Sequence, residues 1–241
     1  EAFLAGARVF FKQWGDYEPP QQGNAKFKDF VNTFAAFMSY FKEYHPGSDA
    51  VQPFVKSDGT IGAEFRFAIP LPIKHPETGD PIFYGGRSDL LGIWEERIPC
   101  IVDEKTTYAI SDGWARPFQM RGQFIGYVWA AQQSGFDISC AIVRGIGIQQ
   151  SAIKHIQAEM LYPQWQIDRW YEQMLYKVET LLSEFEKCRE RNWNLNSLQM
   201  SYGNECSSFN GCEMMDLCTA ENPENWYSTF LPRNWDPLND A

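Results

Sequence analysis

Two acidic residues and one lysine stand in short apolar segments of the chain, where charged side chains require partners. Asp89 precedes two leucines, and Asp103 and Lys105 follow the pair Ile101-Val102. Two carboxylates and one ammonium on the same surface can hold Mg²⁺ or Mn²⁺, orient a water molecule and stabilise charge that develops on a phosphate. The residue types therefore predict a divalent-metal site suited to phosphodiester chemistry.

A β-hairpin would bring these side chains together. If residues 83–94 and 98–106 are strands, Trp94 pairs with Ile98, and counting back along both strands places Asp89 opposite Asp103. Facing residues lie about 5 Å apart, so two like charges there are unfavourable unless a cation lies between them. Side chains alternate along a strand, which puts Lys105 on the face of Asp103 and Glu104 on the other face.

A helix predicted for residues 111–134 adds two polar side chains to this region. Gln123 and Tyr127 are four residues apart and therefore share one helix face. They could steady Lys105 or contact a phosphate. The alternative is that Tyr127 belongs to the core and Gln123 is its solvated neighbour.

The elements that must position these residues follow from hydrophobic periodicity and from glycine and proline breaks. Helices are predicted for residues 1–14, 25–44, 111–134 and 163–191, and strands for 61–71, 83–94, 98–106 and 138–148. From residue 192 onward Asn, Ser, Gly and Pro dominate, so little regular structure is expected there. This order predicts a mixed α/β domain with a central sheet flanked by helices.

A second group of candidate ligands lies near the end of the chain. Cys206, Cys212 and Cys218 have C-x5-C-x5-C spacing in a segment with little predicted structure. Three thiolates so close in sequence suggest a bound metal, and zinc or an iron–sulfur cluster would fit. The alternative is three partly buried thiols. The remaining cysteines are expected to be buried in the core: Cys100, Cys140 and Cys188.

Composition narrows the functional classes. The 241 residues carry 31 acidic and 21 basic side chains, a net charge of −10, which argues against a protein that coats nucleic acid. The sequence has no apolar run long enough to span a bilayer, no visible signal peptide, and no motif for a nucleotide-binding loop, a serine hydrolase elbow or a zinc protease. The three histidines fall in turn-like or exposed contexts, which argues against a catalytic triad.

The order Asp89, Asp103-x-Lys105 and Gln123-x-x-x-Tyr127 on strand, strand and helix resembles the PD-(D/E)XK nuclease superfamily. Within it, the chain is most similar to the RecB-like exonuclease branch, which includes iron–sulfur nucleases of phages and of CRISPR adaptation. The resemblance covers roughly residues 60–218 and implies a restriction-endonuclease-like αβββαβ core. It implies that Asp89 and Asp103 bind metal, that Lys105 is the catalytic lysine and that Gln123 and Tyr127 support the site. Glu64 matches an upstream acid of the family and would be a further metal ligand; the alternative is that it forms an ion pair at the end of its strand.

The same resemblance implies a [4Fe–4S] cluster held by Cys206, Cys212, Cys218 and one cysteine ahead of the nuclease core. The chain has no cysteine before Cys100 and begins at Glu1 without Met, which suggests that the native N-terminus is missing. Two departures from the family are visible. The cysteine spacing differs from the more usual C-x2-C-x5-C, and the histidine that relatives carry on a helix is matched only by His45 in a turn-like segment.

These observations predict a Mg²⁺- or Mn²⁺-dependent deoxyribonuclease, an exonuclease of recombination, repair or phage DNA processing. A nuclease-like fold without activity, serving as a DNA-binding or scaffold subunit, is the alternative, and a ribonuclease or site-specific endonuclease is a third reading. We expect a nuclease domain over residues 1–200 and a cysteine-rich segment over 201–241, packed on it. The expected partners are DNA and a recombination or helicase protein rather than a membrane, in the cytoplasm, or the host cytoplasm if a phage encodes the protein.

Overall fold

The computed structural model describes residues 2–15, 17–18, 26–57, 59–194, 206, 211–231 and 236. The chain divides into two compact units, Glu1–Phe67 with Gly86–Trp170, and Ala68–Gly85 with Tyr171–Ala241. The domain boundary expected at residue 200 lies outside the described residues and stays a prediction.

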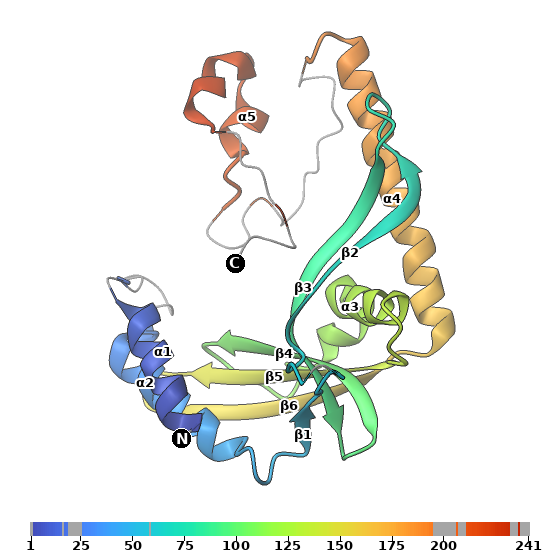
Figure 1. Ribbon diagram of the computed structural model, residues 1–241. Coiled ribbons are helices and arrows are strands. Elements are labelled where there is room, and N and C mark those ends of the chain that lie inside the picture. Colours follow the sequence, from blue (N-terminus) through green and yellow to red (C-terminus); the bar gives the residue numbers. More distant parts are fainter. Residues whose placement is uncertain are drawn as a thin grey trace. The chain divides into compact units, whose positions relative to one another are not determined.

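A six-stranded mixed sheet forms the framework of the protein, in the order β1-β3-β4-β5-β6, with β2 paired to β3 off this path. Figure 1 shows β4, β5 and β6 side by side in this sheet. Strands β4 and β5 pair in parallel, and the β1–β3, β3–β4 and β5–β6 pairs are antiparallel. The strands are β1 (Val51–Pro53), β2 (Ala63–Lys74), β3 (Pro81–Trp94), β4 (Ile98–Thr107), β5 (Cys140–Ile148) and β6 (Ile153–Leu161).

Helices flank the sheet, so the predicted mixed α/β architecture is confirmed, with a loop-rich C-terminal region. The α-helices are α1 (Ala2–Trp14), α2 (Phe30–Glu43), α3 (Gly122–Gln133), α4 (Gln164–Glu190) and α5 (Met215–Thr219), and two 3₁₀ helices are η2 (Arg116–Met120) and η5 (Pro223–Thr229). Among the described residues, no helix has the length and apolar character needed to cross a bilayer.

Helices α2 and α3 cover opposite faces of β4. Tyr40 of α2 hydrogen-bonds to Glu104, whereas the ammonium of Lys105 lies 5.8 Å from the ring centroid of Phe124 in α3. Since Glu104 and Lys105 are consecutive strand residues, their side chains leave the sheet in opposite directions. Successive side chains of β4 therefore lie alternately on the α2 face and on the α3 face of the sheet.

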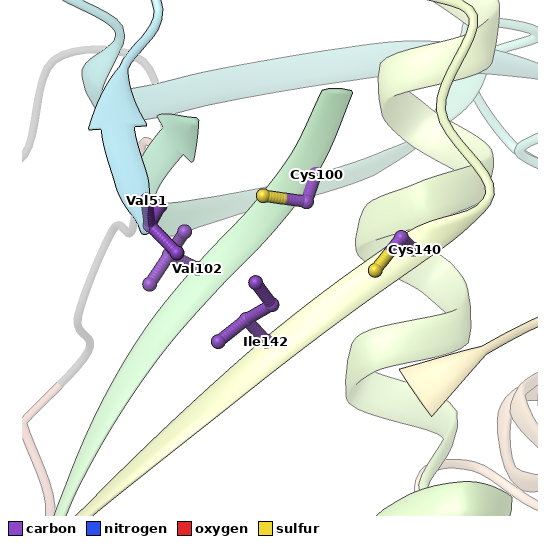
Figure 2. Packing of buried hydrophobic residues seen from close by; sticks show 5 residues of the cluster. All are labelled: Val51, Cys100, Val102, Cys140 and Ile142. Carbon is purple, nitrogen blue, oxygen red and sulfur yellow. The ribbon is translucent and has the colours of Figure 1, made fainter. Parts of the chain in front are cut away.

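The two central strands form the core between these helices. Strand β5 is buried along almost its whole length, whereas β4 is buried at Cys100, Ile101, Val102 and Asp103 and partly exposed towards both ends. Figure 2 shows Val102 and Ile142, neighbours in the parallel register, packed with Val51. The paired Cys100 and Cys140 belong to the same cluster, and burial raises the pKa of these thiols to about 12 and about 11.

Several features of the fold differ from the sequence prediction, among them the short strand β1 and the short helices α5 and η5, which were not predicted. Strand β6 was not predicted, because charged and polar residues lie between its apolar residues and weaken the hydrophobic pattern in the sequence. The helix predicted from residue 111 begins only at Gly122. Residues before it form η2 with Pro117 in its first turn, and Arg121 is extended (φ −78°, ψ 115°), which separates η2 from α3.

The second unit contains the outer part of the β2–β3 hairpin and most of α4. His75 packs edge-on against Phe185, with ring centroids 5.3 Å apart. Glu77 forms an ion pair with Arg189 at 3.5 Å. Cys188 is buried near the end of α4, as the sequence predicts.

Candidate active site

The β3–β4 hairpin has the register expected from the sequence. Trp94 pairs with Ile98, and the ladder continues to Leu90 opposite Val102. Asp89 and Asp103 are the next residues along the two strands. The turn between the strands places Glu95 and Glu96 in the left-handed region, with φ of 48° and 62°.

Asp103 and Lys105 meet on the α3 face of β4. The Asp103 side chain is 3% exposed, and its Oδ2 forms an ion pair with Lys105 Nζ. This oxygen has no other hydrogen-bond partner among the described residues. The Lys105 side chain is 32% exposed, so the pair joins a buried carboxylate to an ammonium that reaches solvent.

Burial dominates the electrostatics of Asp103. Desolvation raises its pKa above the ordinary value, and the Lys105 ammonium opposes this increase. The charge of Asp89 raises the pKa further, whereas Arg121 lowers it. A carboxylate with a buried oxygen of this kind suits a divalent cation, which would supply the positive charge and the coordination that the protein leaves incomplete.

Asp89 approaches the same site from β3. Its side chain is exposed, and its Oδ2 accepts a hydrogen bond of 2.9 Å from the Glu104 backbone N–H. One carboxylate oxygen is thus fixed to the neighbouring strand. The contact holds Asp89 beside β4, within electrostatic range of Asp103.

Gln123 and Tyr127 face each other on α3. Gln123 Nε2 donates a hydrogen bond of 3.0 Å to the Tyr127 hydroxyl. The Tyr127 ring packs edge-on against Phe67 and Phe124, at 5.9 Å and 6.4 Å between centroids. Tyr127 therefore has the packing of a core residue, and its hydroxyl orients Gln123 at the surface of the helix.

Glu64 lies at the beginning of β2 in a different environment. Its Oε2 is 2.9 Å from Arg87 Nε, and both side chains are largely exposed. Its φ of 52° falls in the left-handed region, which costs energy for a residue with a Cβ. The structure thus brings Glu64 to an arginine, as expected for a strand-end ion pair.

The cysteine segment is linked by backbone hydrogen bonds. The Cys212 N–H donates to the Cys206 carbonyl at 2.9 Å, and the Cys218 N–H donates to the Met214 carbonyl at 3.2 Å. Cys206 is partly buried, whereas Cys212 and Cys218 are exposed. Across the described residues, no three His, Cys, Asp or Glu side chains converge closely enough to hold a metal ion. This applies both to the cysteines and to the acidic group of Glu64, Asp89 and Asp103.

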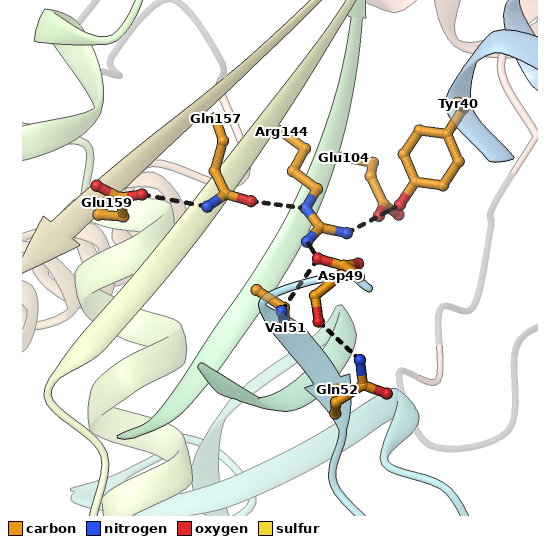
Figure 3. A network of polar contacts seen from close by, with 8 residues as sticks. All are labelled: Tyr40, Asp49, Val51, Gln52, Glu104, Arg144, Gln157 and Glu159. Carbon is orange, nitrogen blue, oxygen red and sulfur yellow. Dashed lines mark hydrogen bonds and ion pairs between the residues drawn. The ribbon is translucent and has the colours of Figure 1, made fainter. Parts of the chain in front are cut away.

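A buried polar network on the other face of β4 was missed by the sequence analysis. Figure 3 shows Arg144 of β5 at its centre, 3% exposed and 2.6 Å from Asp49. Arg144 also donates to Gln157 at 3.0 Å and to the Tyr40 hydroxyl at 3.4 Å, and Tyr40 donates to Glu104. The signal was present: Arg144 is the sole charged residue in the otherwise apolar strand β5.

Burial shapes the acid–base properties of this network as well. Desolvation raises the pKa of Glu104, and the hydrogen bond from Tyr40 opposes the increase. The Arg144 guanidinium lies 3.9 Å from the Tyr44 ring centroid, so a cation–π contact adds to its hydrogen bonds. Desolvation likewise raises the pKa of Tyr44, to about 12.

His155 is a second correction to the sequence analysis, which placed it in a turn or exposed segment. It lies on β6, where it is partly buried. Its Nε2 is 2.7 Å from the Ser39 hydroxyl, and its buried Nδ1 has no hydrogen-bond partner among the residues described. Burial lowers its pKa below 6.5.

No family model and no curated protein sequence matches the chain. Among solved structures, it is similar to the protein SSO0001, with 14% identity and a TM-score of 0.31 over 70% of this chain and 69% of that one. It is also similar to a proposed exonuclease from Eubacterium rectale, with 13% identity and a TM-score of 0.32 over 82% of this chain and 77% of that one.

Proposed function

We propose that the chain is a Mg²⁺- or Mn²⁺-dependent nuclease that hydrolyses phosphodiester bonds beside Asp103 and Lys105. The observation that supports this most directly is the buried Asp103 carboxylate, whose Oδ2 has only the Lys105 ammonium as a partner among the described residues. A purely structural ion pair at this depth would be expected to satisfy the carboxylate more completely. Asp89 on the adjacent strand supplies the second carboxylate.

Each side chain has a distinct part in this chemistry. Asp103 and Asp89 would hold the cation, which when bound lowers the pKa of a coordinated water and offsets charge on the phosphate. Lys105 orients the attacking water through its ammonium, and the ion pair with Asp103 fixes its position. Gln123, held by Tyr127, would contact the backbone of the substrate or steady Lys105.

The substrate and mode of attack rest on the resemblance stated above. It favours DNA over RNA and an exonuclease over an endonuclease, in recombination, repair or phage DNA processing. These finer assignments belong to the proposal, because phosphate chemistry by itself does not distinguish sugars or bases.

Cleavage assays on the Asp103→Asn and Lys105→Ala variants test the proposal. Linear single- and double-stranded DNA are incubated with Mg²⁺ or Mn²⁺, and initial rates are compared with wild type. We expect each variant to lose about 10²–10⁴-fold in rate, the range for removing a group that acts in proton transfer or charge stabilisation.

The matched control is Glu104→Gln, which changes an acid on the same strand that points to the opposite face. It should retain activity within several-fold of wild type, since Gln can still accept the Tyr40 hydrogen bond. Circular dichroism checks that all three variants are folded. Wild-type rates in Asp103→Asn or Lys105→Ala would refute the assignment, and DNA binding by wild type without cleavage would favour the non-catalytic scaffold.

We also propose that Cys206, Cys212 and Cys218 bind metal, a [4Fe–4S] cluster or zinc. The thiols do not converge in the described residues, but a backbone hydrogen bond joins Cys206 to Cys212, and Cys218 follows in the short helix α5. Iron and zinc are measured in anaerobically purified protein, together with the visible absorption spectrum. We expect metal in wild type and less in Cys212→Ser, with Cys188→Ser unchanged; a metal-free wild type contradicts the proposal.

A further inference from the structure

A surface next to the candidate site combines cations with exposed apolar side chains. It consists of Met120, Arg121, Trp165 and Arg169, all in the first unit. Residues 113–136 contain two arginines and no acid, although the whole chain carries a net charge of −10. The segment that carries Met120 and Arg121 is therefore locally basic, whereas in α4 the cation Arg169 follows the exposed Asp168.

Arg121 is tied to the candidate site through two aromatic rings. Its guanidinium carbon lies 5.7 Å from the Phe118 centroid, and Phe118 meets Phe124 edge-on at 5.4 Å. The Lys105 ammonium lies over Phe124 at 5.8 Å. Two cations thus lie over two aromatic rings that contact each other. The Arg121 side chain forms no ion pair with any acid in the described ranges.

Met120 continues the surface from Arg121 to the first turn of α4. Its side chain is 79% exposed, and its Sδ is 3.7 Å from Gln166 Nε2, which also donates to the Gln119 carbonyl at 3.0 Å. The adjacent Trp165 is 60% exposed. The Arg169 guanidinium lies 5.2 Å from the Trp165 ring centroid, which holds the indole at the surface.

We propose that this surface binds a single nucleic-acid strand leaving the candidate site, with Arg121 on a phosphate next to the cleaved one and Trp165 stacked on an unpaired base. The inference rests on the proposed function, because the strand is continuous with the phosphodiester at Lys105. A guanidinium that forms no ion pair can bind a phosphate through two hydrogen bonds. An exposed indole stacks on a base only when that base is free of its duplex neighbours. The charge and the aromatic ring together favour a single strand over a protein partner.

The test measures binding by fluorescence anisotropy, with a labelled oligothymidylate and a blunt duplex of equal length, in EDTA so that no cleavage occurs. We expect Trp165→Ala to weaken oligothymidylate binding about 5- to 150-fold, the equivalent of one lost base stack, and to leave duplex binding nearly unchanged. Arg121→Gln should weaken binding of both probes. It should also reduce the slope of log K against log salt by about 0.7 for the single strand, the value for one phosphate contact.

The matched controls are Tyr176→Ala, which removes another exposed aromatic residue from α4, and Arg97→Gln, which removes an exposed arginine from the β3–β4 turn. Both should bind the probes like wild type. Wild-type binding by both Trp165→Ala and Arg121→Gln overturns the inference, and a protein partner then becomes the better occupant.

Cleavage assays separate this inference from the proposed function. If wild type cleaves DNA and the two variants keep its KM for single strands, the inference alone fails. If wild type binds the oligothymidylate without cleaving it, hydrolysis fails while the surface stands. If wild type neither binds nor cleaves, both are rejected.

Discussion

The buried charged groups on the two faces of strand β4 differ in how completely their partners surround them. On the α2 face, Arg144 has Asp49, Tyr40 and Gln157 as partners and is closed off from solvent. On the α3 face, Asp103 is equally buried but has Lys105 as its partner, and Lys105 extends into solvent. Glu104 of β4 joins the closed network through its hydrogen bond with Tyr40, whereas the preceding residue, Asp103, belongs to the open side.

This contrast suggests how a structural network is distinguished from a functional site. A fully hydrogen-bonded charge contributes to a unique packing and has no unused capacity for a ligand. A buried carboxylate oxygen whose one partner among the described residues is a partly exposed ammonium is costly unless a ligand adds further contacts. The α2 face should therefore govern stability, and the α3 face should govern activity.

The largest stability effect is expected from Arg144→Met. Removing this guanidinium leaves Asp49, which is 11% exposed, without its cation, and breaking a buried pair costs about 3–5 kcal/mol of unfolding free energy. The control Arg87→Met breaks the exposed pair with Glu64 and should cost less than about 1 kcal/mol. Urea unfolding compares the two, and equal losses would mean that burial does not distinguish them.

A smaller loss is expected from Tyr40→Phe. This change removes the hydroxyl that donates to Glu104 and accepts from Arg144, so two buried groups lose a partner. The expected cost is about 1–3 kcal/mol in unfolding free energy. Tyr44→Phe keeps the ring that contacts Arg144 and should cost less. A cost for Tyr40→Phe no greater than that for Tyr44→Phe would argue against a tightly coupled network.

The smallest effect is a pH dependence from His155. Burial lowers its pKa in the folded protein, while the unfolded chain titrates near 6.5. As the pH falls through about 6.5, the unfolded chain takes up the proton first, so unfolding becomes more favourable until the folded pKa is passed. Ser39, Tyr40, Tyr44 and Glu43 are the groups that face this ring, and the Glu43 charge only partly offsets the burial.

His155→Gln should flatten this dependence. Unfolding free energies are measured between about pH 7 and pH 5, and the wild-type curve should fall more steeply than that of the variant. His45→Gln, which changes an exposed histidine after α2, is the control and should retain the wild-type slope. Parallel curves for wild type and His155→Gln would show that this histidine does not contribute.

Much of the hairpin was predictable from local sequence. The apolar alternation and the short polar turn fix Trp94 opposite Ile98, so the approach of Asp89 to Asp103 follows from counting. Alternation along β4 also predicts that Glu104 and Lys105 leave opposite faces, as observed. Strand β6 was not predictable in this way, because its sequence mixes apolar with polar and charged residues. The late start of α3 was not predictable either, because a proline-containing 3₁₀ turn precedes the helix.

The amino-acid sequence alone determined which residues share a face of β4, because a strand alternates its side chains whatever surrounds it. It also carries the resemblance of Asp89, Asp103 and Lys105 to a nuclease motif, on which the proposed function rests. Only the tertiary structure decided which charged side chains are buried with several partners and which are paired with a group that reaches solvent. Asp49, Tyr40 and Gln157 come from elements far apart in the chain, and they reach Arg144 only when α2 and β6 pack against β5.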